Sequence, residues 1–275
     1  PVFLFVFNAH WGKTNSKLFA SLPNITIAKT TDTMPPTDPS HMVLVPRSVA
    51  VFKGGQKLIG DISSRFKVDE ASYTLQSVAG HRYWIAPLTL ISLGDTINFS
   101  DSESPGYVVV DAEDPDADSD LKKGFHIKLF SDQQWALWVK RHAYQHGYSD
   151  AVLSTPFFEV DDQWQPYWTF GYLKKPFGGM QGLVLDKIVM VNVAQEEPDM
   201  QVATPKDRPD WLDRAIEPSM IETYANDWGW YGRGKASDYW SIFWNWNKEG
   251  TLQPAEIELN YTTDSDNVYV VPMTG

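Results

Sequence analysis

The sequence predicts an α+β protein made of tandem units, each with a helix and a small antiparallel meander sheet. The main observation is a set of three similar stretches that read as a strand, a polar or glycine-containing turn, and a return strand. They are "SYTLQSVAGHRYWIAPL" at 72–88, "FFEVDDQWQPYWTFGYL" at 157–173 and "IELNYTTDSDNVYVVPM" at 257–273. A candidate helix precedes each block, so the repeating unit is helix, strand, hairpin and strand.

The return strands open with Tyr83-Trp84, Tyr167-Trp168 and Tyr269-Val270. The first two blocks also have related third strands, "VVVDAEDPD" at 108–116 and "VMVNVAQEEPD" at 189–199. The third block ends after its hairpin, and a two-stranded hairpin is marginally stable alone. We therefore expect its last strand to pair with earlier residues, with another chain, or with sequence beyond this one.

The expected helices differ in strength. "PRSVAVFKGGQKLIG", from Pro46, places Val49, Phe52, Gln56 and Ile59 near one stripe, although Gly54-Gly55 weakens a helix. "SDQQWALWVKRHAYQHG" at 131–147 has a serine N-cap, a capping-box glutamine and a terminal glycine, and is the best helix of the chain. "RPDWLDRAIEPSMIETYANDWG" at 208–229 reads as helical in part, with a break at Pro218.

These patterns divide the chain into four parts. Residues 1–43 are an N-terminal segment with the Pro-rich linker "TMPPTDPSHM", 44–130 the first repeat, 131–206 the second, and 207–275 a helix, a Trp-rich insertion and an incomplete third repeat. The opening "PVFLFVF" is far shorter than the roughly 20 residues that span a bilayer. It is either a core strand or the stub of a membrane helix, so a membrane anchor outside this chain stays open.

Composition excludes several functions. The net charge of −12 disfavours nucleic acid and anionic membrane surfaces as partners. The chain has no cysteine, which excludes disulfides, Cys-ligated zinc and a Cys nucleophile. It also lacks a GxSxG elbow and a phosphate-binding GxxxxGK[ST] loop.

The repeated unit resembles the PepSY repeat, a small extracytoplasmic α+β module. The resemblance lies in a helix followed by a meander with a D/G-x-x-x-Y turn and a last strand of three apolar residues and Asp or Asn. Asp111 and Asn192 occupy that last position, but Ala112 and Val193 follow them where the family has a Gly turn. The resemblance implies a periplasmic or cell-surface location, tandem arrangement beside membrane helices and a protein-interaction or regulatory role. It implies no catalytic residues.

Two kinds of side chain are candidates for chemistry. His142 and His146 lie four apart on one face of the strong helix, a spacing suited to two metal ligands. The alternative is a pair of helix-end histidines favoured by the helix dipole, and we therefore expect no metal and no cofactor. A glycoside hydrolase would need two carboxylates facing a cleft. The candidates are Asp161, Asp162, Asp210, Asp213, Glu217, Glu222 and Asp227, of which Asp161 and Asp162 read as turn residues and Asp210 as a helix start.

The most unusual segment is "DWGWYGRGKASDYWSIFWNWN" at 227–247. Its tryptophan and tyrosine residues are Trp228, Trp230, Tyr231, Tyr239, Trp240, Trp244 and Trp246. Such a cluster stacks on sugars, anchors a protein partner, or fills a core. We favour a non-catalytic, extracytoplasmic, membrane-associated or assembly-forming protein that acts by contact with a protein partner or by self-assembly. The alternatives are a carbohydrate-binding module or acid/base glycoside hydrolase, and a virion or other structural subunit.

Overall fold

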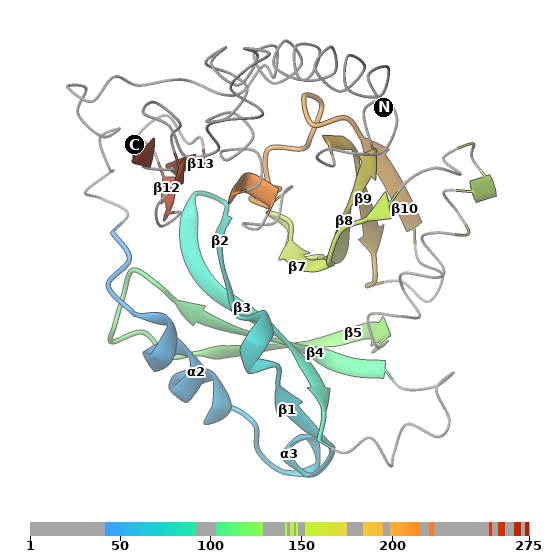
Figure 1. Ribbon diagram of the computed structural model, residues 1–275. Helices are drawn as coiled ribbons and strands as arrows, with labels where there is room; N and C mark the ends of the chain where they lie inside the picture. The colour runs from blue at the N-terminus through green and yellow to red at the C-terminus, as the bar shows by residue number, and fades with distance from the viewer. Residues whose placement is uncertain are drawn as a thin grey trace, which may run out of the picture. The chain divides into compact units, whose positions relative to one another are not determined.

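The computed structural model describes two β-sheets and several shorter elements (Figure 1). The described residues are 42–91, 103–128, 141, 144–145, 147, 152–174, 184–194, 199–214 and 220–222, with strand segments 253–254, 258–261, 267–270 and 273–274. The chain divides into two compact units. The sheet unit comprises Asp38–Lys175 and Leu183–Ile216, and the terminal unit comprises Pro1–Thr37, Pro176–Gly182 and Glu217–Gly275.

The first sheet contains five antiparallel strands. They are β1 (Phe66–Val68), β2 (Thr74–Val78), β3 (His81–Leu90), β4 (Glu103–Asp111) and β5 (Asp120–Lys128). β1 and β2 pair with one edge of β3, β4 pairs with the other, and β5 pairs with β4.

The second sheet has the same number of strands and the same connectivity. Its strands are β6 (Val152–Leu153), β7 (Phe157–Val160), β8 (Pro166–Lys174), β9 (Val184–Asn192) and β10 (Asp199–Ala203). β6 and β7 pair with one edge of β8, β9 pairs with the other, and β10 pairs with β9. In each sheet the first short strand, β1 or β6, pairs near the C-terminal end of the long central strand, β3 or β8. The second short strand, β2 or β7, pairs nearer the start of that strand.

The two sheets also share their register at the Tyr-Trp positions. Tyr83 of β3 lies opposite Asp111 of β4, and Tyr167 of β8 lies opposite Asn192 of β9. Tyr83 and Tyr167, which the similar sequence stretches match to each other, therefore occupy corresponding positions in the two sheets.

A side-chain oxygen of the last residue forms the turn after β4 in the first sheet and after β9 in the second. Asp111 Oδ1 accepts from the backbone N–H of Glu113 at 2.8 Å, and Asn192 Oδ1 accepts from Ala194 N–H at 2.9 Å. Asp and Asn form such local turns readily. This bond explains how both strands end without the glycine turn of the PepSY pattern.

Helices are sparse in the described residues. They comprise α2 (Arg47–Gly55), α3 (Asp61–Arg65), a short 3-10 helix (Glu70–Ser72), and isolated helical positions at 141, 144–145 and 220–222. The prediction of an α+β fold with a helix for each unit is wrong, because the part of the chain that the structure describes is mostly β and contains only one helix, α2, longer than seven residues. The expected helix at 131–147 lies mainly outside the described residues, and Pro209 to Arg214 form a turn and irregular chain where a helix was expected.

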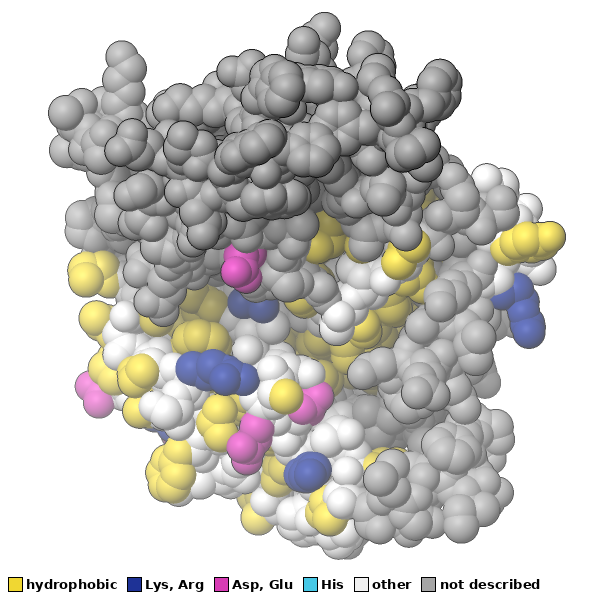
Figure 2. Space-filling model, viewed as in Figure 1, with side chains coloured by type: hydrophobic (Ala, Val, Ile, Leu, Met, Phe, Trp, Pro, Cys, Tyr) yellow, Lys and Arg dark blue, Asp and Glu magenta, His cyan; other side chains and the backbone are white. Residues whose placement is uncertain are grey.

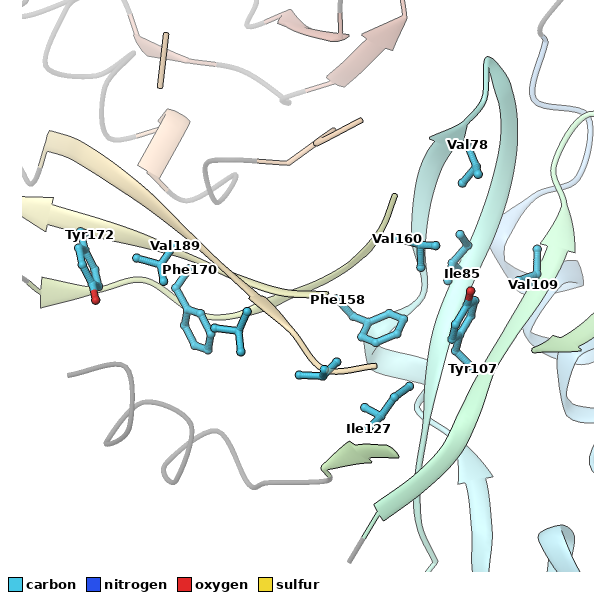
Figure 3. Packing of buried hydrophobic residues seen from close by; sticks show 12 residues of the cluster. Val78, Ile85, Tyr107, Val109, Ile127, Phe158, Val160, Phe170, Tyr172 and Val189 are labelled. Atoms are coloured by element: carbon cyan, nitrogen blue, oxygen red, sulfur yellow. The ribbon is translucent and has the colours of Figure 1, made fainter. Parts of the chain in front are cut away.

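The second sheet packs against the first instead of requiring a helix of its own. One core cluster contains buried residues of both sheets, and Figure 3 shows Ile85 and Tyr107 of the first near Phe158 and Val160 of the second. The rings of Tyr107 and Phe158 have centroids 5.5 Å apart. A sheet must bury its apolar face, and a second sheet can cover that face in place of a helix.

The opposite face of the first sheet packs against α2, which belongs to a second buried cluster. α2 contacts it through Ala50 and Gly54, which are both buried. A Cβ on Gly54 would lie 1.9 Å from the Tyr73 hydroxyl oxygen, so this glycine permits the close approach. The predicted helix is confirmed, but its large apolar stripe faces outward: Phe52 is 66% exposed and Ile59, just beyond the helix, is 78% exposed.

The terminal unit includes two strand pairs. β12 (Glu258–Tyr261) pairs with β13 (Asn267–Val270), which confirms the predicted hairpin near the C-terminus. β11 (Gln253–Pro254) pairs with β14 (Met273–Thr274), which follows the hairpin. In the described residues β13 pairs with β12 alone, so the further partner expected for the hairpin is not found there. In the described residues, no helix combines the length and apolar character needed to cross a bilayer.

Candidate functional site

The residues predicted to form a site are only partly described. The seven aromatic residues Trp228, Trp230, Tyr231, Tyr239, Trp240, Trp244 and Trp246 lie outside the described residues, as do the weak metal candidates His142 and His146. Of the candidate carboxylates, Glu217 and Asp227 also lie outside, and Glu222 is exposed in the terminal unit. Asp161, Asp162, Asp210 and Asp213 are described and belong to the sheet unit.

Asp161 shapes the β7–β8 turn, as the sequence predicts. Its Oδ1 accepts from the backbone N–H groups of Gln163 at 2.9 Å and Gln165 at 2.8 Å. Trp164 adopts a positive φ of 62° in the same turn. Asp210 lies in a turn that Leu212 N–H closes by donating to Pro209 O at 3.1 Å, and it does not begin a helix.

Asp162 and Asp213 satisfy backbone donors of the first sheet. Asp162 Oδ1 accepts from Ala79 N–H at 2.7 Å, and Asp213 Oδ2 accepts from Ser77 N–H. Ser77 lies in β2, an outer strand of the first sheet, and Ala79 lies in the exposed turn that follows this strand. These two carboxylates therefore join chain segments 83 and 136 residues apart.

Gln76 makes the most direct connection between the two sheets. It is 1% exposed; its Nε2 donates to Phe158 O at 2.7 Å, and its Oε1 accepts from Val160 N–H at 2.9 Å. The side-chain amide thus bonds the edge of β7 as a backbone peptide group would. Nothing in the hydrophobic pattern distinguished this glutamine from an ordinary strand residue.

Glu159, which the sequence did not single out, is the most unusual carboxyl group of the sheet unit. It is fully buried, and neither carboxyl oxygen has a hydrogen-bond partner in the described part of the chain. Burial, and secondly the charge of Asp213, raise the pKa of Glu159 well above its usual value, while Arg214 acts in the opposite direction. Burial therefore favours the neutral form of this carboxyl group and gives a substrate no direct access to it.

A half-exposed cluster surrounds His81 at the start of β3. His81 Nε2 lies 2.9 Å from Asp111 Oδ2, and His81 Nδ1 lies 3.1 Å from Glu113 Oε2. A general base needs a ring nitrogen free to take a proton, and a metal ligand needs a free lone pair. Both ring nitrogens of His81 face carboxylates, so neither is free to act as a catalytic base. The two contacts instead join the start of β3 to the end of β4.

Aromatic rings extend from this cluster toward the second sheet. His81 and Tyr83 have ring centroids 4.7 Å apart, and Tyr83 meets Trp164 edge-on at 5.2 Å. Lys122 Nζ lies 4.7 Å from the centre of the Trp164 ring. Because Lys122 and Tyr83 both pack against it, the indole is engaged within the sheet unit and is a poor platform for a sugar.

The largest concentration of exposed apolar side chains surrounds α2. Six of the ten large hydrophobic residues exposed in the described part of the chain fall within residues 42–59. We call them the α2 ridge: Met42, Val43, Leu44, Val49, Phe52 and Ile59. Figure 2 shows hydrophobic side chains recurring over the α2 side of the sheet unit, with basic and acidic side chains between them.

The basic residues beside the ridge are tied to the sheet unit. Arg47 Nη2 donates to Glu70 O at 2.6 Å, and Lys53 Nζ donates to Ala117 O at 3.0 Å. Lys57 Nζ lies 3.9 Å from Asp118 Oδ2. With these cations already paired, the ridge presents apolar groups more than positive charge.

Metal binding and similarity to known proteins provide no further assignment. The described residues contain no group of three His, Asp or Glu side chains arranged to hold a metal ion. Comparisons with protein-family models, curated proteins and solved structures find no match.

Proposed function

We propose that this chain is a non-catalytic, assembly-forming protein that acts through contacts between protein surfaces. The observation that carries the proposal is the α2 ridge. Val49 and Phe52 are exposed on a helix whose small residues face the core, and the other four exposed apolar residues precede or follow this helix in the chain. Apolar surface gathered in this way marks interaction sites on folded proteins.

The best-fitting occupant of the ridge is the same ridge on a second copy. Apolar contact is non-directional, so one patch can meet its own copy across a two-fold axis. The exposed area of six such side chains is on the order of several hundred Å². Because a standard interface buries about 800 Å² per partner, we expect a weak, reversible contact.

The carboxylates and histidine support the non-catalytic part of the proposal. Asp161, Asp162 and Asp213 bind backbone groups, and His81 lies between two carboxylates. Each of these groups has a structural partner. The extracytoplasmic and membrane-associated placement remains part of the proposal, and it rests on the PepSY resemblance. Fractionation of the source cells tests it, and recovery of the chain in the cytosol would contradict it.

We also propose that the two sheets are copies of one ancestral unit. The shared strand connectivity, the register at Tyr83 and Tyr167, and the turns at Asp111 and Asn192 support this. It predicts that relatives of this chain retain Asp or Asn at both turn positions. Relatives with unrestricted residues at both would contradict it.

The ridge contact is tested with Phe52→Glu in the full chain. Phe52 is two-thirds exposed, so the substitution should leave the unfolding midpoint within about 2 °C, but a carboxylate buried in an apolar contact is costly. We expect the light-scattering mass of the wild-type chain to rise with concentration, and the variant to have a lower mass at every concentration.

Ile91→Glu is the matched control, because Ile91 is an exposed apolar residue immediately after β3 and outside the ridge. It should retain the wild-type masses. Equal masses for wild type and Phe52→Glu throughout the series would refute the ridge contact.

A further inference from the structure

β10 has the features of a strand edge that accepts another strand. It lies at the end of the second sheet and, in the described part of the chain, pairs with β9 alone. Asp199, Gln201 and Val202 are exposed, and Val202 retains 39% of its accessible surface. An outer strand of this kind presents unpaired backbone groups along its free side.

Three other outer strands of the two sheets have features that protect their edges. β5 carries Lys122 and Lys123, and Gly124 has a φ of 92° beside a register shift with β4. Lysines and bulges are the features by which edge strands avoid further pairing. Asp213 accepts from Ser77 N–H of β2, Asp162 accepts from Ala79 N–H just after that strand, and β6 is only two residues long. β10, with the sequence Asp-Met-Gln-Val-Ala, contains no lysine, proline or glycine.

We propose that β10 is a second contact surface, at which two copies of this chain pair strand to strand about a two-fold axis through Gln201. The inference rests on the proposed assembly function and names the partner as a second copy. Antiparallel pairing centred on Gln201 places Met200 opposite Val202 of the other copy and Asp199 opposite Ala203. No two like charges are then directly opposite, which is the arrangement that destabilises a strand pair.

The side chains on each face of β10 fit this pairing. Met200 packs against the core cluster shared by the two sheets, and Val202 follows it on the same face. Pairing would bring Met200 of one copy onto the exposed Val202 of the other. Gln201 would meet its own copy, and amide side chains can donate and accept with each other. In the single chain its Nε2 donates to Asp199 Oδ2 at 3.4 Å, a long bond that is easily exchanged.

The acidic residue of β10 does not prevent the pairing. The two copies of Asp199 would be separated by four residue positions along the paired strands, or about 14 Å at 3.4 Å per residue. That separation exceeds the Debye length of about 8 Å at physiological ionic strength, so their repulsion is largely screened.

Two different two-fold contacts on one chain have a consequence for the assembly. A single self-complementary contact closes after two copies, whereas a second one lets each dimer bind another. Pairing at β10 and contact at the α2 ridge together therefore produce oligomers larger than a dimer. Loss of either surface leaves a dimer through the other, and loss of both leaves a monomer.

Charge exchange at Gln201 tests the two-fold pairing in the full chain. Gln201→Lys places two like charges opposite each other, and Gln201→Glu does the same with the opposite sign. We expect each variant alone to bind its own copy at least tenfold more weakly at β10. An equimolar mixture should recover association as a mixed dimer, because lysine then faces glutamate. Sedimentation in the Phe52→Glu background isolates this contact from the ridge.

The outcomes separate the two surfaces. If the mixture of Gln201→Lys and Gln201→Glu chains associates again, β10 pairing is supported, even if Phe52→Glu alone does not lower the mass. Association of the mixture together with an unchanged mass for Phe52→Glu would refute only the ridge contact. A mixture that associates no better than its components, or a Phe52→Glu chain that remains monomeric with Gln201 unchanged, overturns the β10 pairing. Gln163→Lys, at an exposed glutamine in the β7–β8 turn, is the control and should not alter the masses. Circular dichroism spectra matching the wild type confirm that the variants fold.

Discussion

Glu159 shows how one buried residue links stability to pH. Its raised pKa means that the folded chain keeps a proton that the unfolded chain releases as the pH rises above the ordinary glutamate value. The unfolded state then binds fewer protons than the folded state, so the free energy of unfolding falls with rising pH. The contribution is favourable at low pH and is lost between the ordinary pKa and the raised one.

We predict that Glu159→Gln removes this part of the pH dependence. The amide remains neutral at every pH and has nearly the same shape as the protonated acid. Relative to the variant, the wild-type chain should lose up to about 1.4 kcal/mol per pH unit above the ordinary pKa. Chemical denaturation at pH 4 to 8 measures the difference.

The exposed Glu70→Gln is the control for this experiment and should run parallel to the wild type. Parallel curves for wild type and Glu159→Gln would show that Glu159 ionises normally in the folded protein. The prediction would then be wrong.

The α2 helix illustrates what the sequence can predict about an element. Its start after Pro46 followed from the sequence, but the predicted stretch runs to Gly60, whereas the helix ends at Gly55. The direction it faces did not follow from the sequence, because the hydrophobic stripe of Val49, Phe52 and Ile59 is the stronger pattern and yet faces solvent. The small residues Ala50 and Gly54 pack against the sheet, a preference that depends on the position of Tyr73.

We predict that Gly54→Ala destabilises the protein by about 1 to 3 kcal/mol, because the new methyl group overlaps the Tyr73 hydroxyl and crowds Val108. Tyr73→Phe removes that hydroxyl, which is buried without a hydrogen-bond partner in the described residues. The double variant should therefore recover part of the loss. Urea unfolding of the four chains measures the coupling, and additive effects would contradict the proposed overlap.

The sheets show the same division between what was predicted and what was not. The hairpins and third strands were predicted because alternating apolar residues and turn residues are local signals. Their packing against each other was not, because Gln76, Asp162 and Asp213 make contacts 82 to 136 residues away in the chain. A polar residue that bonds a distant backbone looks in the sequence like any exposed polar residue. The buried position of Glu159 was missed for the same reason.

At the scale of the whole molecule, net charge sets the conditions for assembly. Each copy carries a net charge of −12, so two copies repel each other at long range. The two proposed contacts are by contrast apolar or strand-to-strand, and salt weakens neither directly. Screening therefore reduces the repulsion while leaving the short-range attraction in place.

We predict that association strengthens when the ionic strength increases. The Debye length shrinks from about 30 Å at 0.01 M to about 8 Å at 0.15 M, so most of the gain should occur in that range. Sedimentation equilibrium of the wild-type chain with sodium chloride should give an association constant that rises at least several-fold. The double variant Phe52→Glu/Gln201→Lys should remain monomeric at every salt concentration. An association constant that falls as salt is added would indicate that the copies bind through opposite charges, in conflict with contacts made by the ridge and β10.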